Sequence, residues 1–263
     1  LDVDEQVPAE VVYEGGETTS EDGLVTASKT IKHTGENNFE ITLEVTTKDQ
    51  VTTTPAEDTH VVLVIDRSNS MAGDRIKKAR AAAEQFTDIV LGEGAADGNQ
   101  IAVVSYSWNY EDRIGLSGDL SQVKTAIGTV TTGGNERNGG TNIQAGIHRA
   151  QEILAADTSD AKKVILVLSD GEPTYSYQAT GTGSWDGCWK GLVGDHYWGF
   201  GSAKNVQFTG FNYNKVTGSG RSYWLDGGAT IDVTCKHGKS TTVSGEIFSN
   251  NGQPAIKEAE FAK

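Results

Sequence analysis

The sequence predicts an α/β fold, a doubly wound parallel sheet with helices on both faces. Two unbroken apolar runs, at residues 61–65 and 164–168, are typical of strands that are covered on both faces. A shorter run at 101–104 lies between them. Apolar residues at steps of three and four separate the runs, which is the period of an amphipathic helix. These helical stretches cover residues 76–90, 120–127 and 143–154. Strands that alternate with helices in this way build a parallel sheet.

A β-rich extension is expected to precede this domain. Phe39, Ile41, Leu43 and Val45 alternate with polar residues, which predicts a half-buried strand over 38–48. A second strand is expected at 24–32, with turn chemistry between the two. We therefore divide the chain into an N-terminal β extension and linker, residues 1–57, and an α/β domain, residues 58–263.

The stretch at about 175–250 is interpreted as a β-rich insertion in the α/β domain. It is rich in Gly, Ser, Thr, Trp and Tyr, and strand-like pieces occur at 229–233 and 242–248. A helical pattern resumes at Ala255, behind Pro254 as a first-turn residue.

Composition excludes several classes of function. The net charge of −14 and the pI of about 4.7 argue against binding of nucleic acid or of an anionic membrane surface, although they also fit solubility alone. No apolar run approaches the roughly 18–20 residues that span a bilayer. The GxSxG, Walker, CxxC and HExxH signatures of enzymes and metal sites are absent from the sequence, so we expect a protein that is not an enzyme. The chain opens on Leu-Asp-Val-Asp, and we interpret it as trimmed at its start.

Oxygen-bearing side chains follow two of the buried strands. Asp66, Ser68 and Ser70 come directly after the first, and Asp170 comes after the last, while Thr141 stands before a helix. Ligands bind beyond the carboxyl ends of strands in such sheets. Carboxylates and hydroxyls are hard ligands that suit Mg²⁺, Mn²⁺ or Ca²⁺. A simpler interpretation makes Ser68, Ser70 and Thr141 helix caps and Asp170 a turn residue.

The pattern Asp66-x-Ser68-x-Ser70, with the later Thr141 and Asp170, resembles the metal-ion-dependent adhesion site of von Willebrand factor A and integrin I domains. The resemblance covers about residues 58–174 and the terminal helix. It implies a Rossmann-like sheet, a divalent cation (Mg²⁺ first, Mn²⁺ or Ca²⁺ as alternatives) and a protein ligand that donates an acidic side chain. It also implies further strands and a last helix, so we expect the domain to be truncated at its C-terminus.

The flanking segments 22–31, 169–175 and 252–259 resemble surface proteins of Gram-positive bacteria, pilus-tip adhesins above all. This resemblance implies a secreted protein of the cell wall or pilus that binds a host extracellular matrix protein and contacts other pilus domains. The oxidising setting favours a Cys188–Cys235 disulfide over two separate buried thiols. In related pilins a lysine placed as Lys29 forms an isopeptide crosslink, but a solvated lysine is the preferred interpretation here.

The insertion is expected near the metal edge, because it follows Asp170 directly. Its aromatic residues either form a recognition surface or fill a small core of the insertion. The candidates for ligand binding are Trp185, Trp189, Trp198, Tyr223 and Trp224, with Tyr197 and Phe200 in the same group. A second cation at Asp186 and Asp195 is disfavoured. The leading hypothesis is a metal-dependent adhesin domain. The alternatives are a structural pilus or cell-wall subunit, and a carbohydrate-binding module that uses the aromatic insertion.

Overall fold

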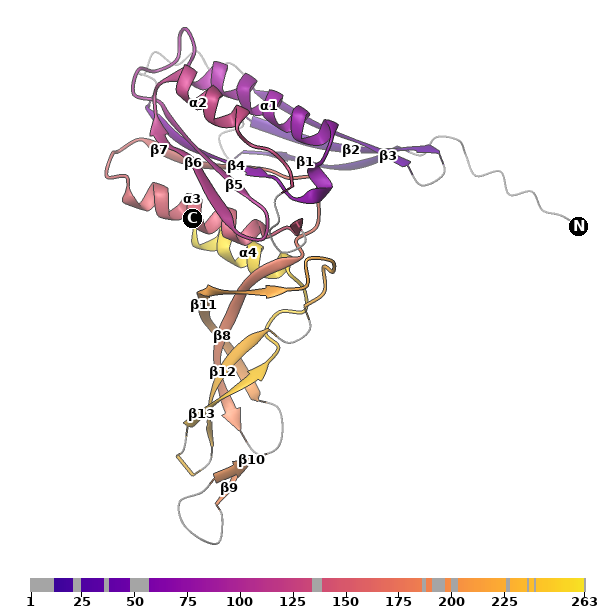
Figure 1. Ribbon diagram of the computed structural model, residues 1–263, viewed down its shortest axis with the longest axis vertical. Helices are drawn as coiled ribbons and strands as arrows, with labels where there is room; N and C mark the ends of the chain where they lie inside the picture. Colours follow the sequence, from indigo (N-terminus) through magenta and orange to yellow (C-terminus); the bar gives the residue numbers. More distant parts are fainter. Residues whose placement is uncertain are drawn as a thin grey trace, which may run out of the picture. The chain divides into compact units, whose positions relative to one another are not determined.

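The structure is a computed structural model, shown in Figure 1, and it has two units, Leu1–Pro55 and Ala56–Lys263. The structure describes residues 12–20, 25–35, 38–47, 57–133, 139–185, 188–190, 197–199, 203–225, 228–235, 237–238 and 240–262.

The first unit is an antiparallel sheet of three strands in the order β1-β2-β3. The strands are β1 (Val12–Thr19), β2 (Val25–Gly35) and β3 (Asn38–Thr47). The sequence predicted β2 and β3 but not β1. The predicted half-burial of β3 is wrong within this unit, because Ile41, Leu43 and Val45 are 56%, 70% and 61% exposed. A single sheet offers no second layer to cover its apolar face. Lys29 is exposed in β2, so its isopeptide bond stays a prediction.

The second unit is built on a four-stranded sheet in the order β6-β5-β4-β7. Its strands are β4 (Thr59–Asp66), β5 (Gln100–Tyr106), β6 (Tyr110–Ser117) and β7 (Lys162–Leu168). The three predicted strands are parallel, and β6 joins the edge antiparallel to β5. The α/β fold class is therefore confirmed. The sequence did not predict β6, since this half-exposed strand lacks an apolar run.

Helices cover both faces of this sheet (Figure 1). They are α1 (Asp74–Leu91), α2 (Leu120–Gly128), α3 (Ile143–Ala156) and α4 (Gly252–Phe261). Val61, Leu63 and Ile65 pack against α1 and α2, while Val62 and Val64 pack against α3. Successive side chains of β4 therefore point to opposite faces of the sheet and belong to two separate cores. None of the helices in the described ranges has the length and apolar character needed to cross a membrane.

The insertion forms a second four-stranded sheet in the order β11-β8-β12-β13. Its strands are β8 (Tyr175–Trp185), β11 (Lys204–Gly218), β12 (Ala229–Cys235) and β13 (Ser240–Gly245), and β9 (Cys188–Lys190) pairs with β10 (Tyr197–Gly199) in a separate ribbon. Ala229, Ile231 and Val233 alternate inward along β12 and build a small core of their own. Trp185 packs against this core, as the core interpretation of the aromatic group expects.

The Cys188–Cys235 disulfide stays a prediction. Cys235 ends β12, is 4% exposed and does not carry a free thiol. Cys188 begins β9, but its side chain lies outside the described residues.

A buried histidine is held near the start of β4. His60 is 4% exposed, with its Nδ1 2.7 Å from Asp157 Oδ2 and its Nε2 3.1 Å from the Gly98 carbonyl oxygen. The Ser159 backbone N–H donates to Asp157 Oδ1 at 3.0 Å. This hydrogen bond first, and the one from His60 second, lower the pKa of Asp157 to about 2. The carboxylate thus stabilises the fold in its ionised form.

Replacing Asp157 with Asn is expected to lower the melting temperature near neutral pH. Because the folded pKa is depressed, the carboxylate stabilises the protein above its unfolded pKa, and this contribution is lost as the pH falls towards about 2. Thermal unfolding of both proteins between neutral and acidic pH should show the deficit of the variant shrinking with acid. The exposed Asp160→Asn is the control, and a deficit independent of pH would contradict this account.

Candidate metal centre

The carboxyl ends of the parallel strands bring the predicted metal residues to one edge of the sheet. Asp66 is the last residue of β4, and its neighbour Ile65 pairs with Leu168 at the end of β7. Ser169 and Asp170 follow β7 directly, so they leave the sheet beside Asp66. The 3-10 turn η1 (Asn69–Met71) carries the chain over this edge into α1.

Asp66 is fully buried and is held by hydrogen bonds on both carboxylate oxygens. The Ser68 backbone N–H donates to Oδ1 at 2.8 Å, and the Ser169 hydroxyl donates to Oδ2 at 2.7 Å. Burial raises the pKa of Asp66, while these hydrogen bonds from Ser68 and Ser169 oppose the rise. The nearby charge of Asp170 raises the pKa further. A positive charge at this edge would therefore stabilise the ionised carboxylate.

The two serines of the motif connect the carboxylates. Ser68 Oγ and Ser70 Oγ lie 2.9 Å apart, and the Ser70 hydroxyl donates to Asp170 Oδ1 at 2.8 Å. The Asp170 side chain is 15% exposed. Hydrogen bonds thus join four of the five predicted metal residues, through the Ser68 backbone N–H at Asp66 and through hydroxyls from Ser68 to Asp170, which lie on loops a hundred residues apart in the sequence.

Thr141 lies at the same edge, but in the described structure its hydroxyl is not bonded to the other four residues. Its backbone N–H donates to Thr174 Oγ1 at 2.9 Å, and its carbonyl oxygen accepts from the Thr174 N–H at 2.8 Å. A Cβ at Gly139 would lie 2.2–2.4 Å from the Asn69 side chain, and one at Gly140 2.6 Å from the Tyr175 ring. The two glycines therefore let the Thr141 loop approach both η1 and the start of the insertion.

Three residues that the sequence analysis did not single out complete the surroundings. The Arg75 guanidinium donates to the Ser70 carbonyl oxygen at 2.7 Å and to Asp170 Oδ2 at 3.2 Å. Ser169 holds the Asp66 carboxylate through its hydroxyl, and its position next to Asp170 was the one feature of the sequence that could have indicated this role. Tyr106 pairs with Asp66 across β4 and β5, and no pattern marked it or Arg75. Arg75 supplies positive charge to Asp170 in the arrangement described.

The residues present fit a hard divalent cation. The set consists of carboxylate and hydroxyl oxygens, which are the ligands that Mg²⁺ and Ca²⁺ prefer. The buried Tyr106 hydroxyl has no hydrogen-bond partner among the described residues, and burial first and the charge of Asp66 second raise its pKa well above the usual value. In the part of the chain that the structure describes, no three His, Cys, Asp or Glu residues gather as a metal site. A cation here would depend on the hydroxyls.

The insertion meets this edge through the loop before Tyr223. The Gly220 N–H donates to the Thr174 carbonyl oxygen at 3.3 Å, and a Cβ on Gly140 would lie 2.8 Å from the Gly220 Cα. Further along this loop, Trp224 is 66% exposed and its ring packs edge-on against Tyr223 at 5.7 Å.

The other predicted recognition residues are placed differently. Trp185 belongs to the core of the insertion. Trp189 and Trp198 are paired across β9 and β10 with Tyr197 beside them, and the side chains of all three lie outside the described residues. Phe200, Asp186 and Asp195 also lie outside the described residues.

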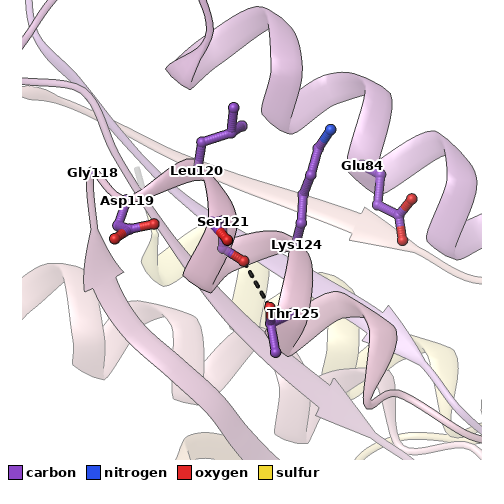
Figure 2. Close-up of a pocket in the computed structure, with 7 residues that line it drawn as sticks. All are labelled: Glu84, Gly118, Asp119, Leu120, Ser121, Lys124 and Thr125. Carbon is purple, nitrogen blue, oxygen red and sulfur yellow. Dashed lines mark hydrogen bonds between the residues drawn. The ribbon is translucent and has the colours of Figure 1, made fainter.

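A shallow, open pocket of about 920 Å³ lies far from this edge, between α1 and the start of α2 (Figure 2). Figure 2 shows its lining residues, Glu84, Gly118, Asp119, Leu120, Ser121, Lys124 and Thr125. Ser117, just before Gly118, pairs with Ile101 near the start of β5, which puts this cavity at the amino edge of the sheet. It contains none of the predicted site residues.

Residues 61–172 match the family described as the von Willebrand factor type A domain. This part of the chain is a von Willebrand factor type A domain. The predicted membership is therefore confirmed, and the match ends just beyond Asp170.

Several of the similar proteins are named as fimbrial or pilus proteins. The minor fimbrium subunit Mfa5 of Porphyromonas gingivalis is 34% identical over 145 residues, which are 54% of this chain and 11% of Mfa5. The crystal structure of the pilus adhesin SpaC from Lactobacillus rhamnosus GG, in its open conformation, matches with a TM-score of 0.51 and 18% identity, over 98% of this chain and 27% of SpaC. The von Willebrand domain of the type V pili tip protein Mfa5 matches with a TM-score of 0.50 and 22% identity, over 78% and 77% of the two chains. The two structural matches show the fold.

Proposed function

We propose that this von Willebrand A domain is a metal-dependent adhesin domain of a bacterial surface pilus. The observation that carries the proposal is the hydrogen-bonded group of Asp66, Ser68, Ser70 and Asp170 at the carboxyl edge of the sheet. These residues, with Thr141, would hold a divalent cation. Mg²⁺ is the proposed ion, with Mn²⁺ or Ca²⁺ as alternatives.

Each side chain has a separate part in this site. Asp66, buried and oriented by Ser68 and Ser169, would supply one negative charge from the end of β4. Asp170 would supply the second charge, and the serine and threonine hydroxyls would supply neutral oxygens. The bound cation provides a Lewis-acidic position that an acidic side chain of a protein ligand can occupy. With two protein carboxylates, the site keeps a preference for a further anionic ligand.

Selectivity for the ligand would come from the insertion loop that reaches Gly140. Exposed aromatic side chains dominate binding hot spots, and Trp224 is presented on this loop beside Tyr223. We propose a host extracellular matrix protein as the ligand, and other pilus subunits as structural partners. The pilus context rests on the relatives, which are fimbrial and pilus proteins. A Gram-positive source and the Cys188–Cys235 disulfide remain part of the proposal.

A structural pilus subunit is the second candidate. The relative Mfa5 is named a fimbrium subunit, and a cation could stabilise the loops at the sheet edge without binding a ligand. A carbohydrate-binding module built on the aromatic insertion is the third candidate. These candidates differ in whether binding requires the metal.

Replacing Thr141 with Ala is expected to weaken binding to a matrix protein by about tenfold or more, and chelation with EDTA to abolish it. Thr141 is 5% exposed and its loop is held through backbone atoms, so loss of the hydroxyl should leave the fold intact. Binding of the full chain to a panel of matrix proteins, in Mg²⁺ and in EDTA, measures both effects. Thr125→Ala, on the exposed side of α2, is the matched control.

The outcomes separate the candidates. Binding that requires both the metal and Thr141 supports the adhesin. Binding that survives EDTA and Thr141→Ala but is lost in Trp224→Ala contradicts the metal mechanism and favours the aromatic insertion. Absence of binding to every matrix protein, with a metal-dependent rise in melting temperature, favours the structural subunit.

A further inference from the structure

A second cleft lies beside the metal edge, between the β5–β6 turn and the insertion. It has a volume of about 620 Å³ and is lined by Trp108, Asn109, Tyr110, Tyr177, Tyr213, Asn214, Lys215 and Val216. This volume falls in the range of about 300–1,000 Å³ that is typical of sites for small ligands. The Asn142 side-chain amide donates to the Trp108 carbonyl oxygen at 3.0 Å, so the cleft wall is tied to the residue that follows Thr141.

Two of the aromatic rings are held in fixed positions. The Tyr213 ring stacks on His148, with centroids 3.6 Å apart and planes 7° from parallel. Its hydroxyl donates to both oxygens of the buried Glu258, at 3.1 and 3.2 Å. Tyr177 meets Tyr213 edge-on at 5.1 Å. A ligand would therefore find this aromatic wall already ordered, which lowers the entropy cost of binding.

The cleft also presents polar groups that lack good partners. Tyr177 is 3% exposed, yet its hydroxyl reaches Asn109 Oδ1 only at 3.5 Å, the upper limit for a hydrogen bond. Neither the side-chain amide of Asn214 nor the ammonium group of Lys215 has a partner among the described residues. A ligand that displaces water from this cleft must therefore form hydrogen bonds with these polar groups and also pack against the aromatic rings.

The chemistry of the lining selects among ligand classes. A purely apolar side chain would leave the phenol and the amides unpaired, which costs free energy. A cationic side chain would meet the exposed ammonium group of Lys215, which lines the cleft. A pyranose sugar has C–H faces that cover aromatic rings and hydroxyls that both donate and accept, as amide and phenol groups require.

We propose that this cleft binds a pyranose unit of a glycan, and that it does so without the metal. The Trp108 and Tyr213 rings pack against the sugar, while Asn109, Asn214 and the Tyr177 hydroxyl bond its hydroxyl groups. The cleft shares no lining residue with the metal centre, so sugar binding does not depend on the function proposed for that centre.

Saturation-transfer NMR on the full chain tests the proposal. The probes are the methyl glycopyranosides of glucose, galactose, mannose and N-acetylglucosamine, each titrated in the millimolar range. We expect saturation transfer to at least one of them, with its affinity reduced about tenfold or more in both Trp108→Ala and Asn214→Ala. EDTA, Thr141→Ala and Trp224→Ala should leave the affinity unchanged.

Two results would overturn the proposal. One is no transfer to any glycoside with the folded wild-type chain. The other is transfer that survives Trp108→Ala and Asn214→Ala, including the case in which Trp224→Ala abolishes it and moves the sugar to the insertion loop. Asn214 is exposed, so Asn214→Ala tests the cleft even where Trp108→Ala unfolds.

Discussion

Replacing Asp66 with Asn is expected to abolish the response of the protein to Mg²⁺ while leaving the metal-free protein at least as stable as the wild type. A cation that binds only the folded state at about a hundred times its Kd stabilises it by about 2.7 kcal/mol. The Asn variant, which lacks the buried negative charge, should gain almost none of this. Thermal unfolding with Mg²⁺ and with EDTA measures the difference between the two proteins.

The pH dependence of the metal-free protein provides the second half of this test. Burial raises the pKa of Asp66 in the folded state above its unfolded value. Its contribution to stability is therefore fully present below the unfolded pKa and is lost as the pH rises through the folded pKa. In EDTA near neutral pH, the buried ionised carboxylate of Asp66 destabilises the folded state, and Asp66→Asn removes this cost. The Ser169 hydroxyl can turn to accept a hydrogen bond from the new amide.

The control for Asp66→Asn is Asp74→Asn, at the start of α1. The Asp74 side chain is 83% exposed, so its replacement should preserve the full Mg²⁺ response. An Asp66→Asn protein that still gained stability from Mg²⁺ as the wild type does would place the cation elsewhere. The proposed adhesin mechanism would then fail with it.

Much of this site could be predicted from the sequence because its residues stand at strand ends. The apolar runs that end before Asp66 and before Ser169 are nearly pure Val, Ile and Leu, and parallel strands place their carboxyl ends together. Spacing along the chain was therefore enough to bring Asp66 and Asp170 to one edge. Arg75 could not be predicted, since its approach to Asp170 depends on the turn geometry of η1.

The parts of the fold that the sequence did not predict lack a periodic apolar signal. β6 is half-exposed, and its position follows from pairing with β5 rather than from its own composition. The long strands β8 and β11 carry glycines and bulges that interrupt their alternation, and they pair across an insertion whose core is small. The aromatic cleft is formed by residues of the β5–β6 turn, β8 and β11, which are far apart in the sequence, so it could not be predicted from the sequence alone.

A buried carboxylate joins the insertion to the α/β domain. Glu258 on α4 is 1% exposed and accepts from Gln144 Nε2 at 2.9 Å and from the Tyr213 hydroxyl at 3.1 Å. His148 Nδ1 lies 2.9 Å from Glu258 Oε1, the oxygen that Tyr213 also contacts at 3.1 Å, while Gln144 bonds Oε2. One side chain thus connects α4 with α3 and with β11, after the chain has returned from the insertion.

Replacing Glu258 with Ala is expected to destabilise the protein by about 3–5 kcal/mol, because removal of one member of a buried polar network leaves its partners uncompensated. Gln144, His148 and Tyr213 would each lose a buried acceptor. Glu258→Gln keeps the size and one acceptor oxygen, so its loss should be smaller. Urea unfolding of the full chain measures both. Glu260→Ala, an exposed change on the same helix, should stay within about 0.5 kcal/mol of the wild type. Equal, small losses in all three variants would show that α4 is held by its apolar contacts, and that Tyr213 is ordered without Glu258.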